Sequence, residues 1–353
     1  MSEPHRPILA ALTGDAAIEA QFTDEAEIHA MLAFEAALAE TESDTSLIPP
    51  EAAKAIVAAC HAHTPDMAAL AAGMAKDGVV VPAFVAALRA QLDEPHRKWL
   101  HYGATSQDAV DTSLVIRLSA VAADLGQRLE GVITQLISLR AAQGATPLMA
   151  QTRMQRALPV TALDKIEDWL HPLSRNSERL AQLRPRLLAV QLGGPVGNRD
   201  VFKERGDEVA AALAMRLGLR PAPPWHNGRD GIVEFAGWLS LLTGALGKIG
   251  QDVALMAQNE IGAVTLAGGG KSSAMPHKTN PIAAEVLVAL ARFNAGAAGT
   301  LHQALIHENE RSGAAWTLEW MLLPQMAITA GAALTHAARL LDALTFNPMK
   351  AKD

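Results

Sequence analysis

Apolar residues recur along two long stretches of the chain at alternating steps of three and four positions, the spacing of a stripe on one side of a helix. The first stretch runs over residues 114–139, with one irregular step near Leu129, and the second over residues 232–256. The positions of the second stripe are Phe235, Leu239, Leu242, Leu246, Ile249, Val253 and Met256. Ordinary surface helices are shorter, so the pattern predicts long helices that pack against each other along their length.

The same spacing predicts two further helices. One should begin near Pro159 and the other at Pro281, because proline suits the first turn of a helix. The only run typical of a strand is residues 79–81, three valines ended at once by Pro82, so we expect no sheet. The chain is therefore predicted to be all-α, a bundle of long helices in which other subunits supply several of the packing partners.

The residues before about position 99 have a different pattern. Their apolar segments are shorter and are interrupted by prolines and glycines, namely Pro49, Pro50, Pro65, Gly73, Gly78 and Pro82. Such interruptions end helices early. We therefore expect an N-terminal helical domain over residues 1–102 and a central long-helix bundle over residues 103–345.

Composition adds several exclusions. A chain of 353 residues can bury a large core, and its formal net charge of −7 offers no basic surface for nucleic acid or an anionic membrane. The N-terminal residues lack the pattern of a signal peptide, and charges interrupt every long apolar segment. The single cysteine, Cys60, excludes an intramolecular disulfide and a thiolate-rich metal site. We expect a cytoplasmic protein with no nucleic-acid and no membrane partner.

Candidate chemistry is concentrated in residues 268–281, GGGKSSAMPHKTNP, where glycines precede two serines, a lysine and an asparagine. Glycine-hinged loops that carry a nucleophile or base and a cation are typical of catalytic lids. A nucleotide phosphate loop is the nearest competing interpretation, but Thr265 stands where that motif needs its first glycine, and the preceding segment is helical in period. An ordinary surface loop between two helices is the other alternative.

This loop resembles the signature loop of the fumarase/aspartase superfamily, and two further blocks resemble motifs of that superfamily in the same order. They are HYGATSQDAVDT at residues 101–112 and QTRMQRALPVT at residues 151–161. Shorter stretches are most similar to the cycloisomerases that act on carboxylated muconates, with adenylosuccinate lyases as the nearest rival: FEAALAE from Phe34, LGGPVGN around Gly194, PWHNGRD, and ENERSGAAW from Glu308. The resemblance extends from about residue 22 to about residue 326.

The resemblance implies an all-α homotetramer of the fumarase/aspartase type, with no metal or cofactor, in which three subunits contribute to each active site. Members of the superfamily make or break a bond beta to a carboxylate, so the expected substrate is a small polycarboxylate. By similarity Ser272 is the base, Lys278 and Asn280 position and neutralise the carboxylate, and Ser273 binds substrate. An unassisted hydroxyl is a poor base, and loop amides together with Lys278 are the candidates for stabilising its alkoxide. No acidic or histidine pair stands at metal-ligand spacing beside the blocks.

In the first block, Thr105 and Ser106 lie at the expected start of a long helix, where unpaired backbone amides favour an anion. We predict that a substrate carboxylate binds there. A hydroxyl that only caps the helix would fit the same position, and capping is compatible with binding. His101 is predicted to bind substrate as well, although a lone histidine more often makes a hydrogen bond within a core.

The block at residues 151–161 departs from the superfamily. Its lyases typically carry a histidine, thought to protonate the leaving group, at the position of Arg153, and a second arginine, Arg156, follows here. Arginine cannot act as a general acid near neutral pH. A carboxylate needs no such acid, because with a pKa of about 4 it leaves or attacks as a stable anion. The block therefore favours a reaction in which one carboxylate of a tricarboxylated muconate attacks within the same molecule to form a lactone. Arg153, Gln155 and Arg156 are then predicted to bind substrate. A solvated helix face is the alternative for the arginines.

Other features bear on the alternatives. Residues 76–79, Lys-Asp-Gly-Val, stand where adenylosuccinate lyases tend to show Arg-His-Asp, which argues against a purine nucleotide. Only one more helix fits after about residue 326, so the superfamily's small C-terminal helical domain is expected to be missing. A fumarate-releasing lyase and a non-catalytic relative stay open. Three polar residues, His226, Arg229 and Arg311, are candidates to face the site, but loop histidines and arginines more often lie on the surface, so they are left out of the predicted catalytic set.

Overall fold

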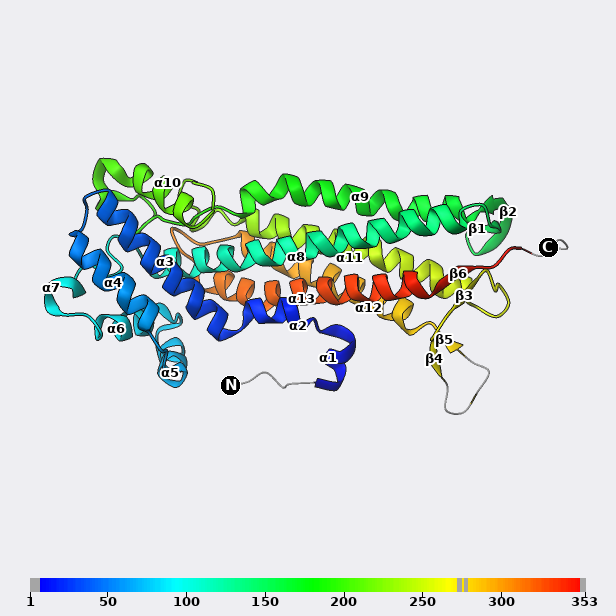
Figure 1. Cartoon of the computed structure of the whole chain (residues 1–353), viewed down its shortest axis with the longest axis horizontal. Helices are drawn as coiled ribbons and strands as arrows, with labels where there is room; N and C mark the ends of the chain where they lie inside the picture. The colour runs from blue at the N-terminus through cyan, green and yellow to red at the C-terminus, as the bar shows by residue number, and fades with distance from the viewer. Residues whose placement is uncertain (1–6, 272–274, 276–278, 350–353) are drawn as a thin grey trace.

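Five long helices lie side by side along an elongated molecule in the computed structural model, which describes residues 7–271, 275 and 279–349 (Figure 1). Within that part of the chain they are α8 (Ser106–Gln143), α9 (Ala162–Leu187), α11 (Asp230–Met256), α12 (Ile282–Leu301) and α13 (Gly313–Ala343). Helix α11 packs against α9, α12 and α13, and α8 packs against α9 and α13. The prediction of an all-α bundle of long helices is confirmed.

Both predicted apolar stripes face the core of the bundle. On α11 the positions from Phe235 to Val253 are fully buried, and on α8 the positions from Leu118 to Leu136 are buried as well. Helix α12 begins directly after Pro281, as predicted, but Phe293 on the expected apolar face is 47% exposed. In a single chain, α12 therefore keeps part of its apolar surface uncovered.

A second group of helices, most of them short, gathers at one end of the bundle around a core of its own (Figure 1). They comprise α3 (Asp24–Asp44), α4 (Pro50–Ala62), α5 (Met67–Asp77), α6 (Val81–Arg89) and α7 (Glu94–Arg97), joined by η2 (Asp200–Arg205) and α10 (Gly206–Arg216) from the middle of the chain. The chain reaches this end through α1 (Pro7–Thr13), α2 (Ala16–Glu19) and η1 (Ala20–Phe22), of which α1 and α2 pack against α13. Helices α3 and α10 pack against each other, so this core draws on residues far beyond position 102. The domain boundary near residue 102 stays a prediction.

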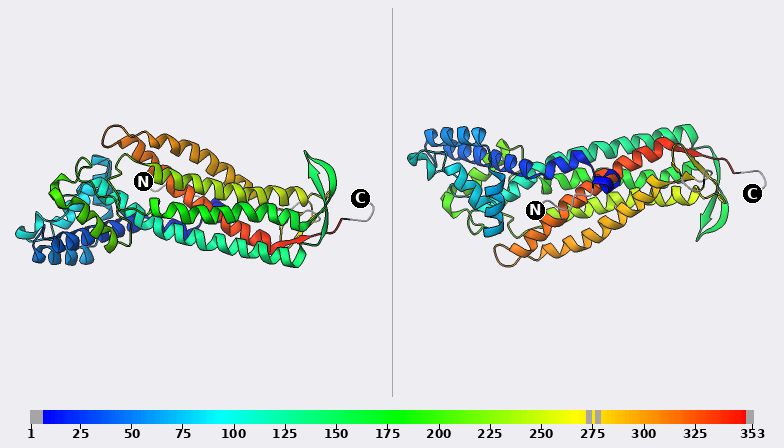
Figure 2. Two further views of the ribbon diagram at one scale, coloured as in Figure 1. Left: turned by 90° about the horizontal axis from the view of Figure 1, so that it is seen from above. Right: turned by 90° about the horizontal axis from the view of Figure 1, so that it is seen from below.

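The expectation that the chain has no strands was wrong. Strands β1 (Pro147–Thr152) and β2 (Gln155–Thr161) form an antiparallel hairpin, which lies across the end of the bundle far from the N-terminal helices (Figure 2). Helix α9 accordingly begins at Ala162 and not near Pro159, because Thr161 and Asp164 form a capping box at that point. The hairpin replaces the first turn of the predicted helix.

The remaining strands and one turn of helix are short. Strand β3 (Val264–Leu266) pairs with β6 (Leu344–Phe346), and β4 (Gly270–Lys271) pairs with β5 (Thr279–Asn280). A single 3-10 turn, η3 (His302–Leu305), follows α12. These strand pairs lie at the same end of the bundle as the hairpin (Figure 1).

Among the described residues, two helices are long and apolar enough to cross a membrane by length and composition alone, α11 and α12. In α11, 61% of the apolar window is buried inside the molecule, as in the core helix of a bundle, and in α12 the share is 33%. The apolar character of α11 is therefore accounted for by helix packing.

Candidate active site

The three sequence blocks lie at two opposite ends of one chain (Figure 1). The block at residues 101–112 forms the start of α8, next to the N-terminal helices, whereas the hairpin follows the other end of α8. At 1.5 Å per residue, the 38 residues of α8 span roughly 57 Å. A substrate of a few ångströms cannot contact both ends of this helix, so the blocks do not form one site within a single chain.

Thr105 and Ser106 begin α8, as the sequence predicts. Thr105 is the N-cap residue in extended conformation, and its backbone amide donates to Asp108 Oδ2 at 2.9 Å in a capping box. Both residues are half-buried, and the Ser106 hydroxyl makes no hydrogen bond to any residue that the structure describes. Thr105 therefore caps the helix, and the first amides of any long helix lack partners within the helix, so this end favours an anion.

Asp108 connects the start of α8 to two loops. Its carboxylate is fully buried and accepts hydrogen bonds from the amides of Gly193 and Gly194, at 2.7 and 2.9 Å, and approaches His226 Nε2 at 2.9 Å. Gly194 has a φ of +73°, and a Cβ there would lie 2.9 Å from the Gly103 carbonyl oxygen, so this position requires glycine. The stretch LGGPVGN is therefore fixed against the helix start.

Arg229 lies at the centre of a buried ionic cluster and not on the surface. Its guanidinium is 1% exposed and donates to both carboxylate oxygens of Asp111, at 2.6 and 3.1 Å, and to Glu319 Oε1 at 2.8 Å. Burial alone would raise the pKa of Glu319, but hydrogen bonds from Arg229 hold that pKa below its usual value. His226 is also buried, with 3% of its surface exposed.

Arg311 is a candidate site residue that the sequence prediction left out. Its Nε donates to Gln107 Oε1 at 3.0 Å, and its Nη2 lies 3.4 Å from Thr105 Oγ1 and donates to the Pro195 carbonyl at 3.1 Å. The guanidinium therefore lies over the start of α8, beside the predicted carboxylate-binding residues. Its place in the ENERSGAAW stretch, one of those carrying the resemblance, was the available signal.

His101 faces the same helix start. Its Nδ1 lies 2.6 Å from Glu35 Oε1 on α3, and its side chain is 12% exposed. Burial lowers the pKa of His101, but the charge and hydrogen bond of Glu35, with the charge of Asp108, outweigh it and raise that pKa above its usual value. His101 stands four positions before Thr105 in the chain. We refer to His101, Arg311 and the first amides of α8 as the cationic cluster at the start of α8, and groups of this kind suit a carboxylate.

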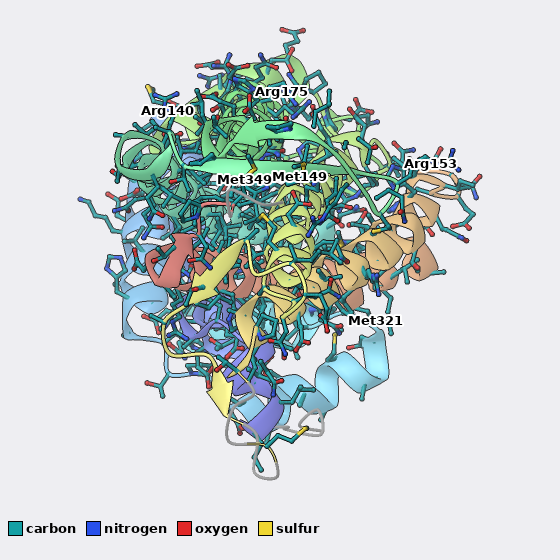
Figure 3. The ribbon with its side chains drawn as sticks, turned by 90° about the vertical axis from the view of Figure 1, so that its right-hand side faces the viewer. Arg140, Met149, Arg153, Arg175, Met321 and Met349 are labelled. Carbon is teal, nitrogen blue, oxygen red and sulfur yellow. The ribbon has the colours of Figure 1, made fainter. Side chains whose placement is uncertain are left out.

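The predicted arginine block forms the tip of the hairpin. Arg153 and Met154 make a two-residue turn between the strands with φ of +48° and +66°, and Gln155 and Arg156 begin β2. All four residues are exposed in the single chain, and Arg153 lies at the outer edge of the molecule (Figure 3). Positive φ values strain the backbone of residues other than glycine, and such strained residues are often found at functional sites.

The signature loop begins and ends at the strand pair β4 and β5. Asn280 is half-buried and pairs with Gly270, where a Cβ would lie 2.2 Å from Cδ1 of Ile282, the first residue of α12, so a larger residue there would have to displace that side chain. Three predicted residues, Ser272, Ser273 and Lys278, lie outside the described residues. Within the described ranges no group of three or more His, Cys, Asp or Glu side chains could hold a metal ion.

Comparison with known proteins decides the family. A protein-family model for lyases matches residues 4–293. The chain belongs to the lyase family. A named family member, 3-carboxy-cis,cis-muconate cycloisomerase of Pseudomonas aeruginosa, is 42% identical over 336 residues, which are 93% of this chain and 73% of the relative. The match supports the predicted resemblance to the cycloisomerase branch of the superfamily.

Solved structures of the lyase family have the same fold. The crystal structure of 3-carboxy-cis,cis-muconate lactonizing enzyme from Pseudomonas putida superimposes with a TM-score of 0.90 at 37% identity, covering 97% of this chain and 78% of that one. The family also includes a nitrosuccinate lyase of Streptomyces davaonensis, 35% identical over 93% of this chain and 72% of the relative. Membership alone therefore allows more than one leaving group, and the hairpin residues must distinguish between them.

Proposed function

We propose that the chain is a 3-carboxy-cis,cis-muconate cycloisomerase, which reversibly converts that triacid to 4-carboxymuconolactone without a metal or an organic cofactor. The observation that carries the proposal is the hairpin tip, where arginines stand in place of the histidine typical of amine-releasing lyases. A cycloisomerase needs cations at this position and no general acid, because the group that attacks or leaves is a carboxylate.

The cationic cluster at the start of α8 is proposed to bind one of the substrate carboxylates. Thr105, Ser106 and the first amides of α8 would donate hydrogen bonds to it, with His101 and Arg311 supplying positive charge. These groups are oriented before substrate arrives, since Asp108 and the loop amides fix the helix start. Binding therefore costs little rearrangement at this end.

The residues of the hairpin and the signature loop are proposed to perform the chemistry and bind the remaining carboxylates. In the lactonising direction, an internal carboxylate oxygen forms a bond to the distal alkene carbon, the alkene electrons move onto the alpha carbon, and Ser272 delivers a proton there. Lys278 and Asn280 neutralise the adjacent carboxylate while the charge is on it. Arg153, Gln155, Arg156 and Ser273 would hold the other carboxylates.

A site that contains both ends of α8 must be assembled from several chains. We propose a cytoplasmic homotetramer in which three subunits contribute to each site. Two observations support the proposal: the roughly 57 Å length of α8 between the blocks, and the exposed apolar side chains on α12 and the hairpin, including Phe293, Met154 and Leu158. Light scattering coupled to size-exclusion chromatography should give the mass of four chains, and a monomer would contradict the proposal.

The reaction can be tested with purified protein by ultraviolet absorbance. Loss of the conjugated diene of 3-carboxy-cis,cis-muconate should accompany formation of the lactone, identified by mass and by nuclear magnetic resonance. Adenylosuccinate and argininosuccinate serve as competing substrates. If either of these releases fumarate and the muconate is not turned over, the chain is a fumarate-releasing lyase and not a cycloisomerase. If none of the three compounds is turned over, the result favours a non-catalytic relative.

Sharing of the site can be tested by mixing two inactive variants. Ser272→Ala and the double variant Arg153→Ala/Arg156→Ala should each form inactive tetramers. After the two are unfolded together and refolded, some sites will receive both unmodified segments from different chains, so activity should return. Mixtures that stay inactive while forming mixed tetramers would place all the reacting groups in one chain.

A further inference from the structure

Glu35 lies directly behind His101 and has no other polar partner among the described residues. Its Oε1 contacts His101 Nδ1 at 2.6 Å, its Oε2 is buried without a hydrogen bond, and the residue is 1% exposed. A buried carboxylate that makes a single polar contact is costly unless that contact is to a positive charge. The contact with His101 therefore accounts for the burial of Glu35.

The backbone of His101 presents the ring to Glu35. His101 has a φ of +59°, which is rarely adopted by residues other than glycine, asparagine and aspartate, and it follows Leu100, whose carbonyl accepts from Arg89 Nη2 at 3.1 Å. Because Nδ1 is occupied by Glu35, only Nε2 can reach a ligand. No described residue hydrogen-bonds to that nitrogen, and Thr105, the N-cap residue of α8, follows four positions later in the chain.

A second buried carboxyl lies behind Glu35, two turns along α3. Glu42 is fully buried, and neither of its oxygens has a partner. Burial and then the neighbouring Glu35 raise the pKa of Glu42 to about 10, and the same causes raise the pKa of the Cys60 thiol to about 12. Around neutral pH both groups are neutral, which leaves Glu35 as the carboxyl group of this core that contacts His101.

We propose that Glu35 is a positioning residue that keeps His101 doubly protonated, with Nε2–H directed to the carboxylate-binding cluster at the start of α8. The inference rests on the proposed function, in which that cluster binds a substrate carboxylate. The tautomer matters because a neutral imidazole that donates from Nδ1 would present an unprotonated Nε2, which repels a carboxylate. With Glu35 ionised beside it, the imidazolium form presents a donor on both nitrogens.

The charges around His101 give the direction of the pH effect. Glu35 from α3 and Asp108 from α8 raise its pKa, whereas burial and Arg89 from α6 lower it, with a net rise above the usual value. The binding-competent form is therefore present below the raised pKa and is lost as pH increases through it. Removing the charge of Glu35 should move this loss to lower pH.

The decisive experiment is the pH profile of kcat/KM for 3-carboxy-cis,cis-muconate in the wild type, Glu35→Gln and Glu42→Gln. The falling limb should shift to lower pH by at least about one unit in Glu35→Gln, so that kcat/KM at pH 8 falls about tenfold or more. Glu42→Gln replaces a neutral buried carboxyl by a neutral amide and should leave the limb in place. Three outcomes would overturn the proposal. The falling limb of the pH profile could stay in place in Glu35→Gln, it could shift equally in both variants, or activity could rise as His101 loses its proton.

A second measurement separates this proposal from the proposed function. Nuclear magnetic resonance of ¹³C-labelled histidine, with His101→Asn used to assign the signal, reports the pKa of His101 without any turnover. The wild-type signal should titrate above 6.5 and that of Glu35→Gln below it. A wild-type value at or below 6.5 contradicts the role of Glu35 even if Glu35→Gln fails to fold, whereas a raised value in a protein that never turns over the muconate would reject only the proposed function.

Discussion

The two ends of α8 differ in how completely one chain supplies their surroundings. At the N-terminal end, Asp108, Asp111 and Arg229 are buried, and each charge has partners within the same chain. At the other end, Arg153 and Met154 stand exposed in a strained turn beyond the bundle. The comparison shows that one chain fixes the start of α8 in place but leaves the arginine turn without covering residues. This difference is the basis for the proposal that other chains complete the site around the arginines.

This difference predicts that substitutions at the two ends have different effects. Changes in the buried cluster should lower the stability of the folded chain, because unpaired buried charges are costly. Changes at the hairpin tip should alter turnover and leave stability almost unchanged, since exposed side chains contribute little to it. Changes at the proposed catalytic residues of the signature loop should likewise act on turnover.

Ser272→Ala should have the largest effect, on activity alone. Loss of a positioned proton-transfer group lowers kcat by about 10²- to 10⁴-fold, and the variant should keep the melting temperature and mass of the wild-type assembly. Steady-state kinetics and calorimetry measure the two quantities. Ser138→Ala, an exposed serine on α8, is the control and should behave as the wild type. Full lactonising activity in a tetrameric Ser272→Ala protein would remove this serine from the mechanism.

Arg229→Met should have the largest effect on stability. It leaves Asp111 and Glu319 as uncompensated buried carboxylates, which costs about 3–5 kcal/mol of the free energy of unfolding, measured by chemical denaturation. Arg186→Met is the matched control, because Arg186 pairs with Glu234 on the surface and its loss should change little. If the two variants are equally stable, the buried cluster is not what fixes the start of α8.

Arg153→Ala and Arg156→Ala should raise KM for the muconate and lower kcat/KM by about 10- to 100-fold each, as expected for lost hydrogen bonds to a charged group. The free energy of unfolding should change by less than about 0.5 kcal/mol, since both side chains are exposed in the chain. Arg175→Ala, an exposed arginine on α9, is the control (Figure 3). Unchanged KM in both hairpin variants would assign the arginines to a solvated surface.

Glu42→Gln should change how stability depends on pH. The folded-state pKa of about 10 lies above the usual value near 4.5, so the folded chain binds more protons and loses stability as pH rises between these values. Removing the group should reduce that loss by up to about 1.4 kcal/mol per pH unit, which denaturation at pH 6, 7 and 8 measures. The control is Glu51→Gln, at an exposed position, which should show the wild-type dependence of unfolding free energy on pH. The same dependence in Glu42→Gln would contradict a neutral, buried carboxyl group at position 42.

The long helices could be predicted from the sequence because their stripes are regular over many turns. On α11, from Phe235 to Val253, every predicted core position is buried, since a stripe of that length has only one side to present to a bundle. The hairpin could not be predicted in this way. Its turn is Arg153-Met154, without the glycine or asparagine that usually reveals a two-residue turn, and Pro159 lies within a strand.

The candidate site was located by its motifs, but its contacts were not predictable. Arg229 follows a polar, proline-rich stretch that is typical of a surface loop, and its partners Asp111 and Glu319 lie 118 and 90 positions away. Pairing at such separations leaves no trace in the local pattern of one sequence. The same holds for Arg311 over Thr105 and for Glu35 behind His101.

The most direct test is a structure of the assembled protein with 4-carboxymuconolactone bound. We expect the guanidinium groups of Arg153 and Arg156 from one chain to contact carboxylate oxygens of the same ligand that the Thr105 and Ser106 helix start of another chain binds. Guanidinium groups that point to bulk solvent, with the ligand held by a single chain, would contradict both the shared site and the reason for proposing a cycloisomerase.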